Sequence, residues 1–152
     1  MMTKILFICH GNICRSPMAE FIFKDMVKRA GRENEFYIES AATSDDEIFR
    51  GIGNPVYPPA REQLLLHGID PGEKRARRLT REDYNNFDLL IGMDKMNMRN
   101  IALMLGEDKE NKIKKLLDYC GGGDVDDPWY TGRFKEAYEC IYKGCKALFK
   151  SF

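Results

Sequence analysis

Apolar positions follow two patterns along the chain, and each pattern predicts a different kind of element. Short uninterrupted apolar runs are typical of strands buried in a parallel sheet, whereas apolar residues three and four positions apart are typical of amphipathic helices. The clearest helical pattern is the last, where apolar side chains recur at Phe134, Tyr138, Ile141, Cys145, Leu148 and Phe152. This spacing predicts a C-terminal helix that packs one face against the core.

The same criteria predict four strands, at residues 4–8, 36–41, 87–93 and 113–117. Helices are expected between them, at residues 16–30, 59–67 and 95–105, with a short helical stretch after Thr80. Ser16 can act as the N-cap of the first helix, and Gly31, Gly68 and Gly106 follow predicted helix ends. Irregular loops are expected at residues 42–58 and 121–128.

Strands that alternate with helices indicate an α/β fold, a single-domain four-stranded parallel sheet flanked by helices on both faces. The chain of 152 residues has the length of one domain and no long linker, so we expect one domain over residues 1–152. Ligands of parallel sheets bind at the carboxyl ends of the strands. Cys9 lies at the end of the first predicted strand, which makes this edge the candidate site.

Composition narrows the classes of function. The 24 Lys and Arg residues balance the 24 Asp and Glu residues, so no net charge draws the chain to nucleic acid or to a membrane, and we expect neither partner. The apolar run at residues 5–9 is too short for a signal peptide or a membrane span, and we expect a cytoplasmic protein. Five cysteines without a Cys-x-x-Cys pair indicate no disulfide framework, and no metal or other cofactor is expected.

Candidate chemistry is concentrated in the segment CHGNICRSP at positions 9–17, between the first strand and the first helix. In such a loop the backbone N–H groups and the positive end of the helix dipole point at one spot and can bind a dianion. Arg15 adds a planar fork of donors that matches two oxygens of a tetrahedral oxyanion. Cys9 lies at the other lip of the loop, where this positive potential favours a thiolate. The arrangement predicts a nucleophile aimed at phosphorus.

Neither residue would carry this prediction alone. Cys9 by itself would more often be a buried cysteine at a strand end, and Arg15 by itself a solvated side chain. Their joint placement in a strand-to-helix turn favours chemistry. Gly11 permits close approach of the backbone, and Asn12 tolerates the left-handed conformation that a cradle of inward N–H groups requires.

Five motifs together resemble the low-molecular-weight protein tyrosine phosphatases. They are Cys-x5-Arg-Ser-Pro near the N-terminus, SAATS at positions 40–44, HGI at 67–69, Met-Asp at 93–94 and DPWY at 127–130. The resemblance covers essentially the whole chain and implies the four-stranded parallel fold of that family. It also implies a phosphatase that acts on a phosphotyrosine-containing protein or peptide and is inhibited by phosphate-like oxyanions.

The same resemblance implies roles for individual residues. Cys9 would attack phosphorus and form a phosphocysteine, Arg15 would hold the phosphoryl oxygens, and Asp127 would protonate the leaving oxygen and then activate water. Ser16 would stabilise the thiolate as leaving group, and a hydrogen-bond network of Asn12, Ser40 and His67 would support the loop. The phosphate-binding loop would comprise His10, Gly11, Asn12, Ile13, Cys14, Arg15 and Ser16.

The residues alone leave the proton donor open. Asp124, Asp126 and Asp127 cluster in one Gly-rich loop, which could bring an acid over a bound phosphate. The choice of Asp127 rests on its match to the Asp-Pro pair of the family.

Two aromatic walls are expected around the pocket. Trp129 and Tyr130 could form one wall against a flat ring, although simple packing would also explain them. Phe49 or Tyr57, in an acidic segment that departs from the family pattern, could supply the other. Cys14 has two interpretations as well: a small residue that fills the loop interior, or a thiol that captures oxidised Cys9.

Three alternative functions compete with phosphotyrosine hydrolysis. A protein arginine phosphatase of the same fold typically carries Thr where Ile13 stands. A thioredoxin-coupled arsenate reductase needs further cysteines, and residues 79–111 contain none. A non-catalytic phosphopeptide-binding module would need Arg15 and the cradle, but neither a thiolate nor an opposed acid.

Overall fold

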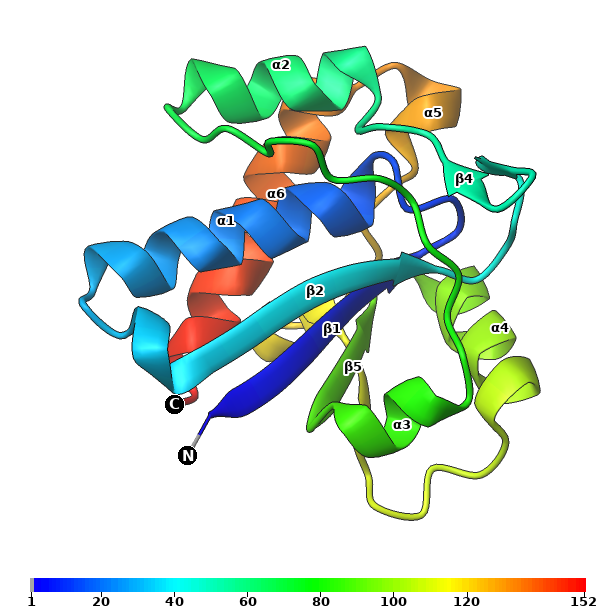
Figure 1. Ribbon diagram of the computed structural model, residues 1–152. Coiled ribbons are helices and arrows are strands. Elements are labelled where there is room, and N and C mark those ends of the chain that lie inside the picture. The colour runs from blue at the N-terminus through cyan, green and yellow to red at the C-terminus, as the bar shows by residue number, and fades with distance from the viewer. Residues whose placement is uncertain (1) are drawn as a thin grey trace.

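The computed structural model describes residues 2–152 and contains one main sheet of four strands. The strands are β1 (Thr3–Cys9), β2 (Phe36–Ala42), β5 (Leu89–Gly92) and β6 (Ile113–Lys115). Their spatial order is β2-β1-β5-β6, and every neighbouring pair is parallel (Figure 1). The predicted parallel α/β fold is therefore confirmed.

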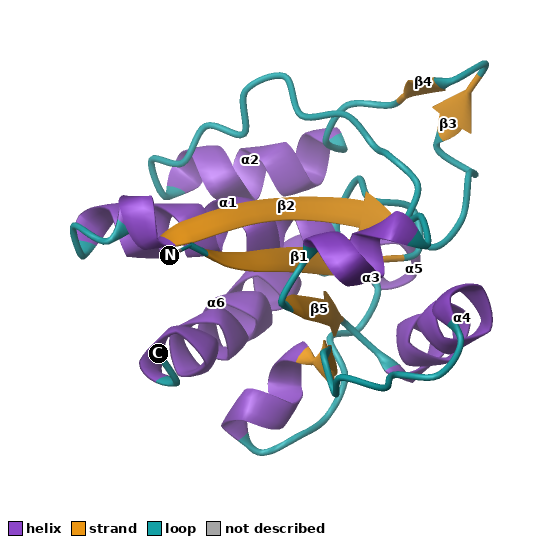
Figure 2. Ribbon diagram, turned by 60° about the horizontal axis from the view of Figure 1, so that its bottom comes forward, coloured by secondary structure: helices purple, strands orange, loops and turns teal. Residues whose placement is uncertain are grey.

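Helices cover both faces of the sheet. α1, α2 and α6 pack together on one face, whereas α3 and α4 lie on the other, as Figure 2 shows. Two 3-10 segments, η1 and η2, complete the architecture, and η2 packs against α6. The bounds of these elements are α1 (Arg15–Arg29), η1 (Glu33–Glu35), α2 (Pro58–Leu66), α3 (Glu82–Asn86), α4 (Lys95–Leu105), η2 (Leu116–Cys120), α5 (Pro128–Thr131) and α6 (Phe134–Lys150).

The apolar run of β1 results from burial on both faces. Ile5, Phe7 and Cys9 belong to the core that α1 and α6 cover, whereas Leu6 and Ile8 belong to the smaller core beneath α4. Successive side chains of a strand point to opposite faces, so a central strand covered on both sides is apolar throughout. Because β1 is a central strand, Cys9 at its carboxyl end has other strands on both sides and helices above and below.

Two predicted elements were wrong in part. The strand predicted at 113–117 ends at Lys115, because Leu116 and Leu117 turn into η2 and are buried against α6. Gly144 permits this approach, since a Cβ atom there would lie 2.6 Å from Leu116 Cγ. The loop predicted at 42–58 contains a short antiparallel hairpin, β3 (Ile48–Phe49) and β4 (Ile52–Gly53).

Three loops meet at the carboxyl edge of the sheet. The N–H of Thr43 donates to the carbonyl of Cys9 over 3.0 Å, and the N–H of Val125 donates to the carbonyl of Met93 over 2.9 Å. The loop after β1 therefore has the segment after β2 on one side and the segment that carries Asp127 on the other. These bonds bring residues that are distant in sequence to one site.

Candidate active site

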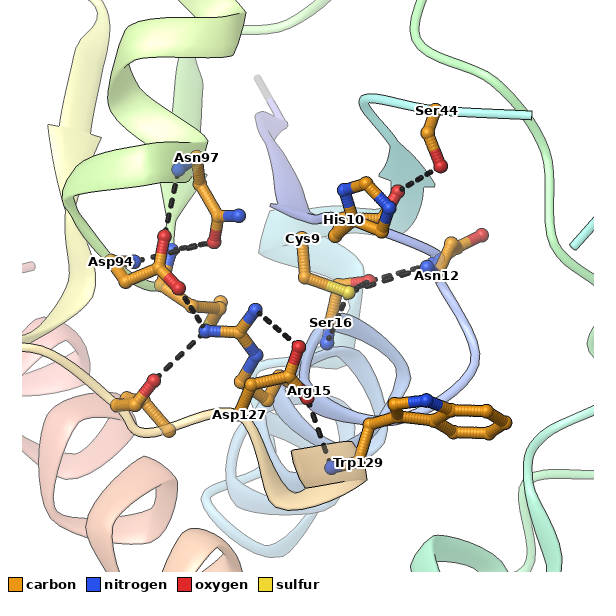
Figure 3. A network of polar contacts seen from close by, with 12 residues as sticks. Cys9, His10, Asn12, Arg15, Ser16, Ser44, Asp94, Asn97, Asp127 and Trp129 are labelled. Atoms are coloured by element: carbon orange, nitrogen blue, oxygen red, sulfur yellow. Dashed lines mark hydrogen bonds and ion pairs between the residues drawn. The ribbon is translucent and has the colours of Figure 1, made fainter. Parts of the chain in front are cut away.

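The loop between β1 and α1 wraps around the sulfur of Cys9. Two N–H groups donate to this atom, that of Asn12 at 3.3 Å and that of Ser16 at 3.4 Å, and the hydroxyl of Ser16 lies 2.9 Å from it (Figure 3). Asn12 has φ of 60°, which confirms the predicted left-handed conformation and turns its N–H inward. The cysteine is only 3% exposed. Its sulfur thus lies in a cradle of hydrogen-bond donors.

Ser16 does not cap α1 as predicted. The N-cap of this helix is Cys14, and no side chain caps it. The Ser16 hydroxyl lies against the Cys9 sulfur instead, and it also accepts a hydrogen bond from Asn12 Nδ2 at 2.8 Å. The capping prediction failed because the hydroxyl is used by the loop and not by the helix.

Arg15 is buried and held by acceptors on two other segments. Its Nη1 donates to Asp94 Oδ2 at 2.5 Å and to the carbonyl of Val125 at 2.8 Å, while Nη2 donates to Asp127 Oδ2 at 3.3 Å. Burial opposes its charge, but the Cys9 sulfur and the neighbouring carboxylates together raise the pKa of the guanidinium above its usual value. Arg15 is therefore a fixed cation beside the sulfur.

Asp94 owes its position to the start of α4. It is the N-cap of this helix, where Oδ1 accepts from the N–H of Asn97 at 2.7 Å. In return, Oδ1 of Asn97 accepts from the N–H of Asp94 at 3.3 Å. This capping box leaves Oδ2 for Arg15. Met93-Asp94 formed part of the family resemblance, but no role for Asp94 was predicted from the sequence.

The structure brings Asp127 to the site and leaves Asp126 outside. Asp127 is the N-cap of α5, where Oδ1 accepts from the N–H of Trp129 at 3.0 Å, and its Oδ2 faces Arg15. Asp126 is exposed and does not line the pocket. The geometry thus distinguishes two carboxylates that composition alone left equivalent.

A pocket of about 280 Å³ joins these groups. Trp129 and Tyr130 line it, whereas Phe49 and Tyr57 do not, so the expectation of an aromatic wall from the 45–59 segment was wrong. Phe49 lies on the exposed hairpin, and Tyr57 packs its ring 4.8 Å from that of Trp129. The remaining lining residues are Cys9, His10, Gly11, Ile13, Cys14, Arg15, Asp46, Glu47 and Asp127.

His10 joins the loop to the acidic side of the pocket. Its Nε2 lies 2.7 Å from Asp46 Oδ2, and its carbonyl accepts from the Ser44 hydroxyl at 3.1 Å. In this segment Asp46 and Glu47 line the pocket, where an aromatic ring was expected. Two carboxyl groups of this acidic segment thus line the pocket.

A buried network supports the loop from beneath. Nδ2 of Asn12 donates to the hydroxyl of Ser40 at 2.9 Å as well as to Ser16, and Oδ1 accepts from the N–H of Arg77 at 3.1 Å. The hydroxyl of Ser40 donates to Glu20 Oε1 at 2.5 Å. Both Asn12 and Ser40 were expected here from the resemblance.

His67 lies outside this network, which corrects the expectation that it supports the loop. Its Nδ1 lies 2.9 Å from the carbonyl of Gln63, and its ring stacks on Tyr138 with centroids 4.1 Å apart. Its position at the end of α2, where it is exposed, directs the ring to α6. Lys74 reaches the network instead, with Nζ 2.9 Å from the carbonyl of Ser40 and 3.4 Å from Glu20 Oε1.

Glu20 and Lys74 were not predicted from the sequence. One signal was available for Glu20: it lies three and seven positions before Phe23 and Val27, on the face of the first helix where spacing predicts burial. A charge on a buried face requires partners. Lys74 gave no such signal, because it lies in an irregular segment.

Two further features concern the described residues. None of the helices within residues 2–152 combines the length and the apolar character needed to cross a bilayer.

Cys14 is 5% exposed, and burial, together with Cys9 and Asp127, raises the pKa of its thiol. Cys14 is therefore a protonated thiol inside the loop.

Comparisons with known proteins agree with this geometry. A family model described as "Low molecular weight phosphotyrosine protein phosphatase" matches residues 4–152. The low molecular weight protein-tyrosine-phosphatase YfkJ of Bacillus subtilis is 39% identical over 99% of this chain and 96% of its own. The crystal structure of YfkJ superposes with a TM-score of 0.93, covering 99% of this chain and 94% of that one.

Two less similar structures are informative about ligands. Vibrio vulnificus Wzb, solved in complex with benzylphosphonate, is 25% identical with a TM-score of 0.86 over the whole of both chains. The YwlE arginine phosphatase, solved as a mutant with a phosphorylated active-site serine, is 29% identical with a TM-score of 0.83, covering 98% of this chain and 95% of that one. The fold thus occurs with more than one phosphorylated substrate.

Proposed function

The chain belongs to the low-molecular-weight phosphotyrosine protein phosphatase family, and on that premise we propose that Cys9, Arg15 and Asp127 carry out its reaction. The activity is that of a protein tyrosine phosphatase, a phosphoric monoester hydrolase. The residue roles rest on one observation above all: two N–H groups and the Ser16 hydroxyl converge on the Cys9 sulfur in the same pocket as a fixed guanidinium and a carboxyl group.

Cys9 is the proposed nucleophile. Its sulfur forms a bond to phosphorus while the bond from phosphorus to the tyrosine oxygen breaks, which leaves a phosphocysteine. Hydrogen bonds from Ser16 and from the N–H of Asn12 favour the thiolate, because each stabilises negative charge on sulfur. The same donors stabilise the sulfur when it later becomes the leaving group.

Arg15 and the loop backbone are proposed to bind the phosphoryl oxygens. Because Asp94 and the Val125 carbonyl hold Nη1, the guanidinium plane is oriented before substrate binds, and little entropy is lost on binding. Nε and the second hydrogen of Nη2, whose first hydrogen points to Asp127, are proposed as a fork for two oxygens. Phosphate-like oxyanions should inhibit by occupying the same cradle.

Asp127 is the proposed acid and base. Its carboxyl group gives a proton to the departing tyrosine oxygen in the first step. In the second step a water molecule attacks phosphorus and Asp127 accepts its proton, while the bond from sulfur to phosphorus breaks and inorganic phosphate forms. The N–H of Trp129 orients the carboxylate through Oδ1, which leaves Oδ2 toward the pocket.

The proposed setting is the cytoplasm, and the proposed partner is a phosphotyrosine-containing protein or peptide, without nucleic acid or membrane. A catalytic thiol needs a reducing compartment, which supports this location. Cys14 is proposed to protect Cys9 by trapping its sulfenic acid as a disulfide.

A panel of phosphorylated peptides tests the substrate. Peptides that carry phosphotyrosine, phosphoserine or phosphoarginine are compared at one sequence, with para-nitrophenyl phosphate as the reference substrate. We expect the highest kcat/KM for phosphotyrosine. A preference for phosphoarginine would identify an arginine phosphatase, and binding without any turnover would identify a phosphopeptide-binding module.

A further inference from the structure

Glu20 is a buried carboxylate that the proposed reaction does not use. It is 3% exposed on α1 and contacts two ammonium groups, Lys24 Nζ at 2.6 Å and Lys74 Nζ at 3.4 Å. Its third partner is the hydroxyl of Ser40 at 2.5 Å. From Ser40 a chain of hydrogen bonds continues through Asn12 to Ser16 and ends at the Cys9 sulfur.

Counting protons fixes the direction of the first bonds in this chain. A carboxylate only accepts, so the single hydroxyl proton of Ser40 goes to Glu20. The oxygen of Ser40 can then only accept from Asn12, which must present its amide nitrogen. At the other end of the amide, the N–H of Arg77 requires the oxygen of Asn12. Both ends therefore select one orientation of the Asn12 amide.

The orientation of Asn12 decides what Ser16 can do. Nδ2 donates to the Ser16 hydroxyl, so that hydroxyl keeps its own proton for another acceptor. The Cys9 sulfur, 2.9 Å away, takes it. A flipped amide would instead present its oxygen to Ser16 and compete with the sulfur for the same proton.

We propose that Glu20 is a positioning residue: as an anion clamped by Lys74 and Lys24, it directs the chain through Ser40 and Asn12 so that Ser16 donates to the Cys9 sulfur. This inference rests on the proposed role of Cys9. A buried carboxylate without compensating charge would take up a proton, and the protonated form could donate to Ser40 and release the proton of Ser40 toward Asn12.

Two lysines from different segments form this clamp, and further charged groups surround Lys74. Lys24 comes from α1 itself, Lys74 from the segment after α2, and Arg77 and Glu39 lie close to Lys74. Burial lowers the pKa of Lys74, and the attraction of Glu20 opposes that shift. Lys74 is more buried than Lys24, with 14% of its side chain exposed against 42%, so it should be the stronger of the two clamps.

The test substitutes Glu20→Gln and measures how fast iodoacetamide alkylates Cys9 between pH 5 and 9, alongside kcat and KM for para-nitrophenyl phosphate. An amide of the same shape can donate to Ser40, which removes the selection on Asn12 at the Ser40 end and leaves only that of the Arg77 N–H. We expect alkylation near pH 6 to slow roughly three- to tenfold, the effect of about one hydrogen bond, with a similar fall in kcat. Alkylation needs no turnover, so it reports on this inference even if the proposed reaction is wrong.

Two controls separate positioning from general support of the fold. Glu39→Gln makes the same change one residue before Ser40, on a carboxylate that pairs with Arg77, and should alter the alkylation profile less than twofold. Ser40→Ala removes the link in the chain between Glu20 and Asn12. In that background Glu20→Gln should have no further effect on alkylation, even where both variants lower the melting temperature.

Either of two results would overturn the inference. One is a Glu20→Gln profile that matches wild type; the other is an effect of Glu20→Gln that persists unchanged beside Ser40→Ala. If Glu20→Gln does not fold, Lys74→Met serves in the same comparison, with Lys24→Met as its exposed counterpart. Equal alkylation profiles for those two variants and wild type would likewise reject a role for the clamp.

Discussion

The two sides of the pocket are built in different ways. The nucleophile side, residues 9–16, is one continuous segment whose side chains Cys9, Asn12 and Arg15 are almost fully buried and bonded to the core. The acid side follows three consecutive glycines with φ of 105°, 94° and 107°, and it carries Trp129 and Tyr130, which are 51% and 81% exposed. Binding and attack thus depend on one buried, continuous loop, whereas proton transfer depends on a separate segment that Val125 and Asp127 tie to the site and whose aromatic side chains are exposed.

This difference predicts a complete loss of activity when the nucleophilic atom of the first side is changed, and a graded loss on the second side. A rigid cradle loses its function when its central atom is changed, since no other group lies at the same position. A side chain on the separate acid segment contributes a separable factor, and its loss leaves the nucleophile intact. The expected effects therefore fall from complete loss of activity at Cys9, through a partial loss at Asp127, to a loss at Cys14 that concerns only recovery after oxidation.

Cys9→Ser should abolish turnover of para-nitrophenyl phosphate. A hydroxyl in the same cradle is a far weaker nucleophile at neutral pH, while Arg15 and the backbone N–H groups still bind phosphate or vanadate. Steady-state kinetics and oxyanion binding by calorimetry check the two halves of this prediction. Turnover near the wild-type rate in this variant would discard a covalent mechanism at Cys9.

Asp127→Ala should slow hydrolysis of aryl phosphates by ~10²-fold to 10⁴-fold, the usual contribution of a positioned acid. Asp126→Ala is the matched control and should have a much smaller effect, because its side chain is outside the pocket. The loss at Asp127 should shrink for phenols of low pKa, since these leave without a proton. Reversed effects of the two variants, or a loss independent of the leaving group, would contradict the assignment.

Cys14→Ser should leave phosphatase activity largely intact and change only the response to oxidation. Peroxide should inactivate the wild type reversibly, with a Cys9–Cys14 disulfide detectable by mass spectrometry and activity restored by dithiothreitol. Without Cys14, the sulfenic acid of Cys9 should oxidise further and most of the recovery should be lost. Recovery equal to wild type would reduce Cys14 to a packing residue.

The nucleophile side could be predicted from the sequence because its determinants are contiguous. A strand end, a Gly-Asn turn, Arg15 and a helix start occur within positions 9–17, and local backbone chemistry dictates the cradle. The fold was predictable for a related reason: the continuous apolar run of β1 reflects burial on both faces, and the helical stripe of α6 reflects burial of one face.

The predictions of the supporting residues failed because those residues make contacts between segments that are distant in the sequence. His67 stacks on Tyr138 of another helix, and Lys74 takes its expected place from an irregular segment. The choice between Asp126 and Asp127 likewise came from the family resemblance and not from composition. Such choices depend on which segments meet at the sheet edge, which local patterns do not encode.

The most direct test of the covalent mechanism is to identify the atom that carries phosphate during turnover. Wild-type enzyme is mixed with para-nitrophenyl phosphate, quenched in acid within milliseconds, digested and examined by mass spectrometry, with Cys9→Ser treated in parallel. Attack by Cys9 predicts a phosphoryl group on this residue that disappears as substrate is consumed. Turnover with no phosphocysteine, or with phosphate on another residue, would contradict it.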